Sequence, residues 1–284
     1  MRNRLFIALS MAVMVFSCAK SRIKEHAEWG KYYDKYGIKK ACFIMRDNNH
    51  ESIQYYNKDR CTERLCPAST FKILLSLVAL ETAVAPDDQL VIKWDSVNRK
   101  PEWDKDMNLR EALTTSSEPY FKELARRIGP VRLQHFMDTI KYGNMKMTGD
   151  VGDVWTNNSI QISADEQTGF LKRLYFGELP VSERSQRIVK TMMLREETPG
   201  YNLYYKTGTC NVNGKTIRWT TGFCERIEHQ KEQSGSMNKT DVRNYPYFFA
   251  QNFELPDGDT TKDWSKVRLD ILHELLKEYG AIAN

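Results

Sequence analysis

The spacing of hydrophobic residues along the chain predicts strands at both ends and helices between them. Residues 39–46 and 52–56 are predicted strands, joined by the polar turn Asp47-Asn48-Asn49-His50. An apolar stretch from Ser69 to about Ala83 then favours a helix. From about residue 108 to residue 193, apolar positions recur at helical spacing. The helices expected there cover residues 118–128, 131–140, 164–176 and 181–194.

After residue 200 the pattern changes to strands. Residues 202–207 and 217–225 predict a hairpin across Asn213-Gly214, a strong turn dipeptide. With that pair at the centre of the turn, Cys210 faces about residue 217 and Cys224 about residue 203, so a bond between these two cysteines is not expected.

A further strand is predicted at residues 245–253, followed by a closing amphipathic helix over 262–279 that ends at Gly280. The apolar face of that helix comprises Trp264, Val267, Ile271, Leu272, Leu275 and Leu276. The order of all these elements predicts an α+β fold: an antiparallel sheet built from both chain ends and flanked by helices, with a mostly helical region inserted. No repeat or Pro/Ser-rich linker interrupts residues 19–284, which we expect to form one domain.

The first residues are typical of an export signal. Residues 5–17 form an apolar run that follows two arginines and is too short to cross a bilayer, so we assign residues 1–18 as a signal peptide. Cys18 ends the run, and Val15-Phe16-Ser17-Cys18 resembles a loose lipoprotein box, which makes Cys18 a candidate for lipidation. Ordinary cleavage before Lys20 is the alternative. In both cases we expect export to the periplasm, with membrane anchoring if Cys18 carries lipid.

Composition limits the function without revealing the chemistry. The chain has 284 residues, of which 41% are hydrophobic and 28% charged, as in ordinary globular proteins. Its net charge of +5 comes without a basic block, so we predict no nucleic-acid partner. Scattered histidines and the lack of a C-x-x-C pair predict no metal site. Five cysteines follow Cys18, and burial as small apolar residues is their simplest interpretation. Disulfides, and the choice between monomer and homodimer, stay open.

Ser69-Thr70-Phe71-Lys72 is the first candidate for catalysis. A serine hydroxyl is a weak nucleophile until a base takes its proton, and a lysine one helical turn further on can reach it. Of four Ser-x-x-Lys sequences in the chain, only this one follows a proline and begins an apolar helix. That context favours a neutral Lys72 amine and makes the Ser69 N–H a donor for an oxyanion. A serine N-cap with a snorkelling lysine is the structural alternative.

Lys206-Thr207-Gly208 is the second candidate, on a predicted strand that runs into the hairpin. A cation, a hydroxyl and a glycine together can bind a carboxylate while the backbone approaches closely. A solvated strand end is the structural alternative. Further motifs lie in order between and after these two: Ser116-Ser117-Glu118, Tyr142-Gly143-Asn144, Trp155, and Arg268 shortly before Gly280.

With these motifs, the stretch from about Ala41 to Gly280 resembles the class D (oxacillinase-type) serine β-lactamases of the penicillin-recognising serine acyl-transferase superfamily. The resemblance implies a β-lactam small molecule as substrate and an acyl-enzyme on Ser69, and hence an enzyme that confers β-lactam resistance. It implies that CO₂ or bicarbonate carbamylates Lys72 to N6-carboxylysine, the general base, with no other cofactor. Trp155 would stabilise this carbamate.

The resemblance also implies the other roles. Ser116 would relay a proton to the leaving nitrogen, and Lys206 would polarise that region. Thr207 and Arg268 would bind the substrate carboxylate, beside Gly208, and the backbone N–H groups of Ser69 and Thr209 would form the oxyanion hole. Tyr142 and Asn144 are expected to shape a loop.

Glu118 departs from the family pattern, because it stands where the family has the valine of Ser-x-Val. Three interpretations are open: the carboxylate pairs with protonated Lys72 and opposes carbamylation, it positions water itself, or it turns outward to solvent. The first leads to an alternative function, a penicillin-binding or sensor-like protein of the same fold that is acylated but turns over slowly. For the function of the whole protein, a third possibility is an envelope lipoprotein that keeps the fold without the activity.

Overall fold

The structure is a computed structural model that describes residues 22–231, 240–256 and 261–282. The predicted signal peptide, residues 1–18, and the lipidation candidate Cys18 lie outside these described residues. Within them, no helix is both long enough and apolar enough to cross a bilayer.

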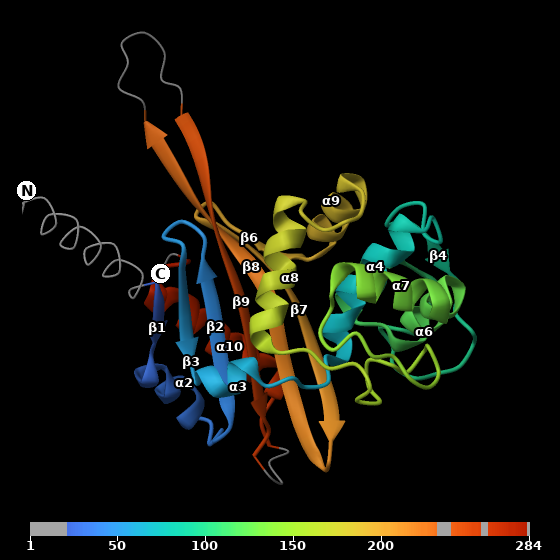
Figure 1. Cartoon of the computed structure of the whole chain (residues 1–284), viewed down its shortest axis with the longest axis horizontal. Coiled ribbons are helices and arrows are strands. Elements are labelled where there is room, and N and C mark those ends of the chain that lie inside the picture. Colours follow the sequence, from blue (N-terminus) through green and yellow to red (C-terminus); the bar gives the residue numbers. More distant parts are fainter. Residues whose placement is uncertain (1–21, 232–239, 257–260, 283–284) are drawn as a thin grey trace, which may run out of the picture.

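A seven-stranded sheet forms the centre of the described part of the chain, in the order β1-β3-β2-β9-β8-β7-β6 (Figure 1). Neighbouring strands are antiparallel, apart from the parallel pair of β1 and β3. Because β2 pairs with β9, the two ends of the chain share one sheet, which confirms the predicted α+β architecture. The strands are β1 (Ile23–Glu25), β2 (Ala41–Asp47), β3 (Ser52–Tyr56), β6 (Leu194–Glu197), β7 (Tyr201–Val212), β8 (Lys215–Lys231) and β9 (Thr240–Glu254).

Helices cover both faces of the sheet. Phe249 of β9 packs in one buried cluster with the closing helix α10, while its neighbours Phe248 and Ala250 belong to clusters on the other side, as strand alternation requires. The inserted region lies beside β7, with α8 across the sheet (Figure 1). The helices are α2 (Lys31–Asp34), α3 (Lys58–Thr62), α4 (Lys72–Glu81), α5 (Leu109–Thr115), α6 (Glu118–Ile128), α7 (Pro130–Ile140), α8 (Ala164–Phe176), α9 (Glu183–Met192) and α10 (Trp264–Tyr279). Two short 3₁₀ helices, η2 (Ala27–Gly30) and η3 (Ala68–Phe71), and a small ribbon of β4 (Val91–Ile92) and β5 (Met107–Asn108) complete the described elements.

The hairpin predicted around Asn213-Gly214 is confirmed in its register. Cys210 pairs with Ile217 and Cys224 with Leu203, so these two cysteines lie far apart along the ribbon. Both turn residues have left-handed backbones, with φ of 50° at Asn213 and 77° at Gly214, as this tight turn requires. The five cysteines of the described ranges are all free and buried, which agrees with their interpretation as small apolar residues.

The helix predicted from Ser69 to about Ala83 is divided in two. The segment 68–71 is the 3₁₀ helix η3, and α4 begins only at Lys72. Pro67 lacks an N–H, and Ala68 has a left-handed backbone with φ of 51°, so a regular α-helical turn does not start here. The Ser69 side chain therefore lies in a tight turn at the entrance to α4.

Candidate active site

The strand β7 lies directly against the turn that carries Ser69. A Cβ atom on Gly208 would lie 3.1 Å from the Ser69 nitrogen, and equally close to the Pro67 oxygen and the Ala68 Cβ. Only glycine lets the two backbones approach this closely without displacement. As a result, Ser69, Thr207 and Thr209 line the same cavity.

Ser69, Lys72 and Glu118 form a compact hydrogen-bonded group. The Lys72 Nζ donates to Ser69 Oγ at 3.1 Å and to Glu118 Oε1 at 2.5 Å. The Ser69 hydroxyl lies 3.3 Å from the same Glu118 oxygen and donates to it. Glu118 thus points inward, so the interpretation that it turns outward to solvent is wrong.

The Lys72 amine has no exposed surface and lies against four oxygen atoms. Besides Ser69 and Glu118, it donates to the Ser116 carbonyl oxygen at 2.9 Å and approaches the Ser116 Oγ at 3.3 Å. Burial lowers the pKa of Lys72, and the neighbouring Glu118 carboxylate offsets part of this lowering. Burial and the carboxylate therefore act on the pKa of this amine in opposite directions, and burial is the larger cause.

Trp155 lies at the other oxygen of the Glu118 carboxylate. Its indole Nε1 donates to Glu118 Oε2 at 3.3 Å, and the ring is fully buried. The loop that carries Trp155 is fixed by the triplet 142–144, since Asn144 donates from its side chain to the Ser159 oxygen at 2.8 Å. A Cβ on Gly143 would lie 2.2 Å from the Gln161 oxygen, so this close approach also requires glycine.

Ser116 lies between the two lysines of the site. It follows α5 with a left-handed backbone, φ 58°, which typically costs a non-glycine residue about 1–3 kcal/mol and is common at functional sites. Its Oγ accepts a hydrogen bond from Lys206 Nζ at 2.9 Å. Burial, followed by the nearby Lys72 cation, holds the pKa of Lys206 well below its usual value. The hydrogen bond from Lys206 and the lowered pKa of that lysine suit a Ser116 hydroxyl that passes protons between amines.

The cavity above Ser69 has a volume of about 530 Å³ and a cationic wall. Arg268 donates to the Gly208 oxygen at 3.3 Å, and burial, followed by the neighbouring Arg218, lowers its pKa to about 10. The Nε atoms of Arg218 and Arg268 are buried without a hydrogen-bond partner among the described residues. Both arginines line the cavity, and guanidinium groups are suited to binding a carboxylate. Lys206, in contrast, does not line this cavity and lies behind Ser116.

Arg218 was not singled out in the sequence, although a signal for it was present. It pairs with Thr209 across the hairpin, and that register follows from placing Asn213-Gly214 at the turn. The other predicted site residues, Ser69, Lys72, Ser116, Trp155, Lys206, Thr207, Gly208, Thr209 and Arg268, all gather in or directly around the cavity.

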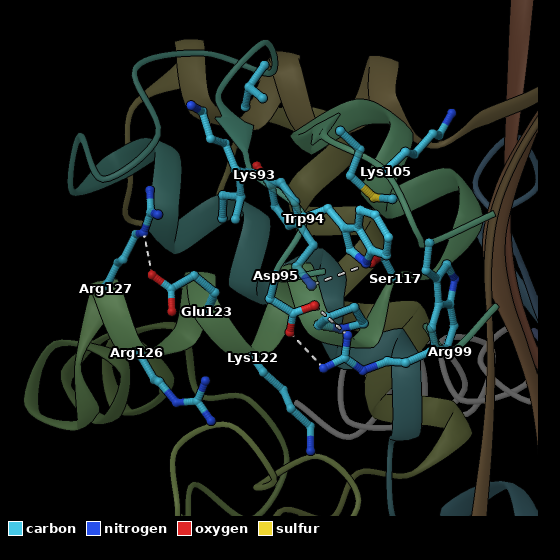
Figure 2. A pocket seen from close by; sticks show the side chains of 16 residues that line it. Lys93, Trp94, Asp95, Arg99, Lys105, Ser117, Lys122, Glu123, Arg126 and Arg127 are labelled. Carbon is cyan, nitrogen blue, oxygen red and sulfur yellow. Dashed lines mark hydrogen bonds and ion pairs between the residues drawn. The ribbon is translucent and has the colours of Figure 1, made fainter. Parts of the chain in front are cut away.

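A second cavity of about 570 Å³ adjoins the first, and Trp103 lines both. Figure 2 shows the basic side chains around it, including Lys93, Lys122 and Arg126. The Asp95 and Glu123 carboxylates there point to Arg99 and Arg127, their ion-pair partners. Trp103 donates to the Thr115 oxygen at 3.0 Å, and residues of the segment 94–103 line both cavities.

Comparison with known proteins assigns the family. Residues 30–233 match the family described as "Penicillin binding protein transpeptidase domain". The chain is 34% identical over 256 residues to β-lactamase OXA-48 of Klebsiella pneumoniae, an alignment that covers 90% of this chain and 89% of that protein. The class D β-lactamase YbXI from Nostoc superposes with a TM-score of 0.78 at 32% identity, covering 89% of this chain and 98% of that one. A class D β-lactamase from Sebaldella termitidis gives 0.82 at 28% identity, covering 92% and 99%. The chain therefore belongs to the class D β-lactamases, serine hydrolases within the penicillin-binding transpeptidase family.

The close approach at Gly208 generates a first prediction. In Gly208→Ala the new Cβ must push β7 away from the Ser69 turn, and misplacement of reacting groups is costly, so the rate of Ser69 acylation by a β-lactam should fall about tenfold or more. Stopped-flow mixing with a chromogenic β-lactam measures this rate.

Gly169→Ala in α8 is the matched control, because a Cβ there meets no atom within 4 Å. It should leave acylation unchanged and raise helix stability by roughly 0.5–1 kcal/mol. Equal acylation rates for Gly208→Ala and the unmodified protein would contradict the importance of this contact.

Proposed function

We propose that the protein hydrolyses the amide bond of β-lactams through an acyl-enzyme on Ser69. The observation that carries the proposal is the Ser69 hydroxyl itself, which lies on a cavity wall within hydrogen-bond reach of an amine and a carboxylate. A nucleophile in contact with groups that can take its proton is what acyl transfer requires.

Acylation uses the groups around Ser69. The Ser69 hydroxyl gives its proton to the adjacent pair of Lys72 and Glu118 as Oγ bonds to the lactam carbonyl carbon. The backbone N–H groups of Ser69 and Thr209 stabilise the oxyanion. The lactam C–N bond then breaks, and the nitrogen takes the proton of the Ser116 hydroxyl. Lys72 and Lys206, at 3.3 Å and 2.9 Å from the Ser116 Oγ, can replace this proton.

The cationic wall selects the substrate. We assign Thr207, Arg268 and also Arg218 to the carboxylate that penicillins and cephalosporins carry, because the hydroxyl and both guanidinium groups face the cavity. Lys206 acts through Ser116 and supports this positive region from behind.

Deacylation needs a carboxylate-like base beside Ser69. The N6-carboxylysine at residue 72 implied by family resemblance stays a prediction. The buried amine, with its lowered pKa, favours the neutral form that reacts with CO₂, whereas the ion pair with Glu118 favours the cation. This ion pair also supports the alternative function, acylation with slow turnover.

Replacing the nucleophile tests the proposal. Ser69→Ala should abolish both β-lactam turnover and the mass increase from a bound acyl group, because no other hydroxyl replaces Oγ. Intact-mass spectrometry and nitrocefin hydrolysis measure the two effects. Ser236→Ala, which lies outside the described residues but has the same sequence spacing to Lys239, should behave like the unmodified protein. Stoichiometric acylation without turnover of the unmodified protein would establish the alternative function, and labelling of Ser69→Ala would reject the assignment.

The carboxylate site gives a separate prediction. Arg268→Ala and Arg218→Ala should each raise KM for a carboxylate-bearing β-lactam about tenfold, because a charge-assisted hydrogen bond contributes about 1.5–3 kcal/mol. A methyl ester of the same substrate should show no such increase. Arg226→Ala, on the same strand as Arg218 but outside the cavity lining, is the control. An equal loss with acid and ester would place the effect elsewhere.

We also propose export: the segment 1–18 is the signal, and cleavage falls before Cys18, which then carries the lipid as the new N-terminus. The apolar run at 5–17 and the cysteine at its end support this. The prediction is that the protein is recovered in the membrane fraction of a bacterial host with metabolically incorporated fatty acid, and that Cys18→Ser moves it to the soluble periplasm. Recovery of the uncleaved chain in the cytoplasm would contradict export.

A further inference from the structure

We propose that Glu118 is the general base of this enzyme and replaces the carbamylated lysine of its family. The proposal rests on the proposed acyl-enzyme at Ser69 and names the group that accepts the proton in both half-reactions.

The Glu118 carboxylate is oriented by three neighbours. Oε1 accepts from Lys72 at 2.5 Å and from Ser69 at 3.3 Å, and Oε2 accepts from the Trp155 indole at 3.3 Å. An ammonium and an indole N–H on separate oxygens fix the plane of the carboxylate. One oxygen is thereby held against the nucleophile itself.

The position of Glu118 on α6 also suits a base. It is the first residue of the helix, where the backbone N–H groups favour a negative charge. Its side chain is 30% exposed and lines the cavity with Ser69, whereas Lys72 is fully buried. Water that enters the cavity can therefore reach the carboxylate but not the amine.

A carbamate on Lys72 would duplicate this group. It would add a second planar O–C–O anion at an amine that already has the Glu118 oxygen at 2.5 Å, and two such charges repel each other. Trp155, the donor expected to hold the carbamate, donates instead to Glu118. The side chain thus supplies, without CO₂, the same functional group beside Ser69.

In acylation, the Ser69 hydroxyl proton passes to Glu118 Oε1 as Oγ bonds to the lactam carbonyl carbon. The C–N bond breaks, and the nitrogen takes the Ser116 hydroxyl proton. The Lys72 ammonium replaces the Ser116 proton and recovers one from protonated Glu118. The net result is one proton moved from Ser69 to the lactam nitrogen, along contacts of 3.3, 2.5 and 3.3 Å.

In deacylation, a water gives one proton to the Glu118 carboxylate while its oxygen bonds to the ester carbonyl carbon. When the C–O bond to Ser69 breaks, the serine oxygen takes that proton back from Glu118. The products are the free serine and a carboxylic acid, which ionises in solvent. Lys72 remains an ammonium that orients the base.

The test compares turnover with and without bicarbonate. Nitrocefin hydrolysis by the unmodified protein should be the same in degassed and in bicarbonate-supplemented buffer, and ¹³C-bicarbonate should give no carbamate signal by NMR. Glu118→Gln should lower bicarbonate-free turnover about 100-fold or more, as expected for loss of a general base, and accumulate the acyl-enzyme by mass. Glu118→Val, which restores the family pattern, should recover turnover only with bicarbonate and then show the carbamate signal.

Glu123→Gln is the matched control, an exposed carboxylate on the same helix that pairs with Arg127 at 2.9 Å, and should change neither rate nor signal. A carbamate signal and bicarbonate-stimulated turnover in the unmodified protein would overturn the proposal, as would full bicarbonate-free turnover by Glu118→Gln. The carbamate signal and the effect of bicarbonate on turnover are both measured on the unmodified protein. They therefore test the proposal even if a variant fails to fold.

The outcomes distinguish failure of the proposed function from failure of the role of Glu118. If the unmodified protein is neither acylated nor active, the proposed function fails and Glu118 loses its role with it. If it is acylated but not hydrolysed, Ser69 keeps its assignment as the nucleophile, the alternative function replaces hydrolysis, and Glu118 as the deacylating base is rejected. If it hydrolyses β-lactams only with bicarbonate, the proposed function stands with the lysine carbamate as its base.

Discussion

The contact between Lys72 and Glu118 is the interaction on which the rest of the site depends. A fully buried ammonium requires a nearby anion and hydrogen-bond acceptors, since water cannot reach it. Its partners come from three separate segments: the turn at Ser69, the start of α6, and Ser116 at the end of α5. The ion pair therefore joins the helical region to the nucleophile.

Two irregular backbone positions place the remaining groups around this pair. The left-handed Ser116 turns its carbonyl oxygen and its hydroxyl toward the two lysines, and Gly208 lets β7 lie against the Ser69 turn. Neither position contributes charge. Both determine how far apart the reacting groups lie. A misplacement of about 1 Å can lower the rate of acyl transfer about 100-fold. The site is therefore formed where the sheet and the inserted helices meet, and neither part contains it alone.

Long segments with a periodic pattern of apolar residues made the fold predictable from sequence. Some short elements carry no such pattern and were not predicted. Helices α6 and α8 have the predicted bounds because both have an apolar face, while β6 and α5, of four and seven residues, are too short for a periodic signal. Motif order pointed to the lysines and serines that the structure brings together beside the cavity. The inward direction of Glu118 was not predictable, because it results from the packing of α4, α6 and the Trp155 loop, which lie far apart in sequence.

The pairing of β2 with β9 has a consequence for how the chain reaches this structure. Ala41 lies opposite Phe253, so the sheet cannot close until nearly the whole polypeptide is available. Within the inserted region, α6 contacts α5 and α7, its neighbours in sequence, and such local contacts can form earlier because they require less loop closure. The pairing of β2 with β9, which joins segments far apart along the chain, is thus expected to form late in folding.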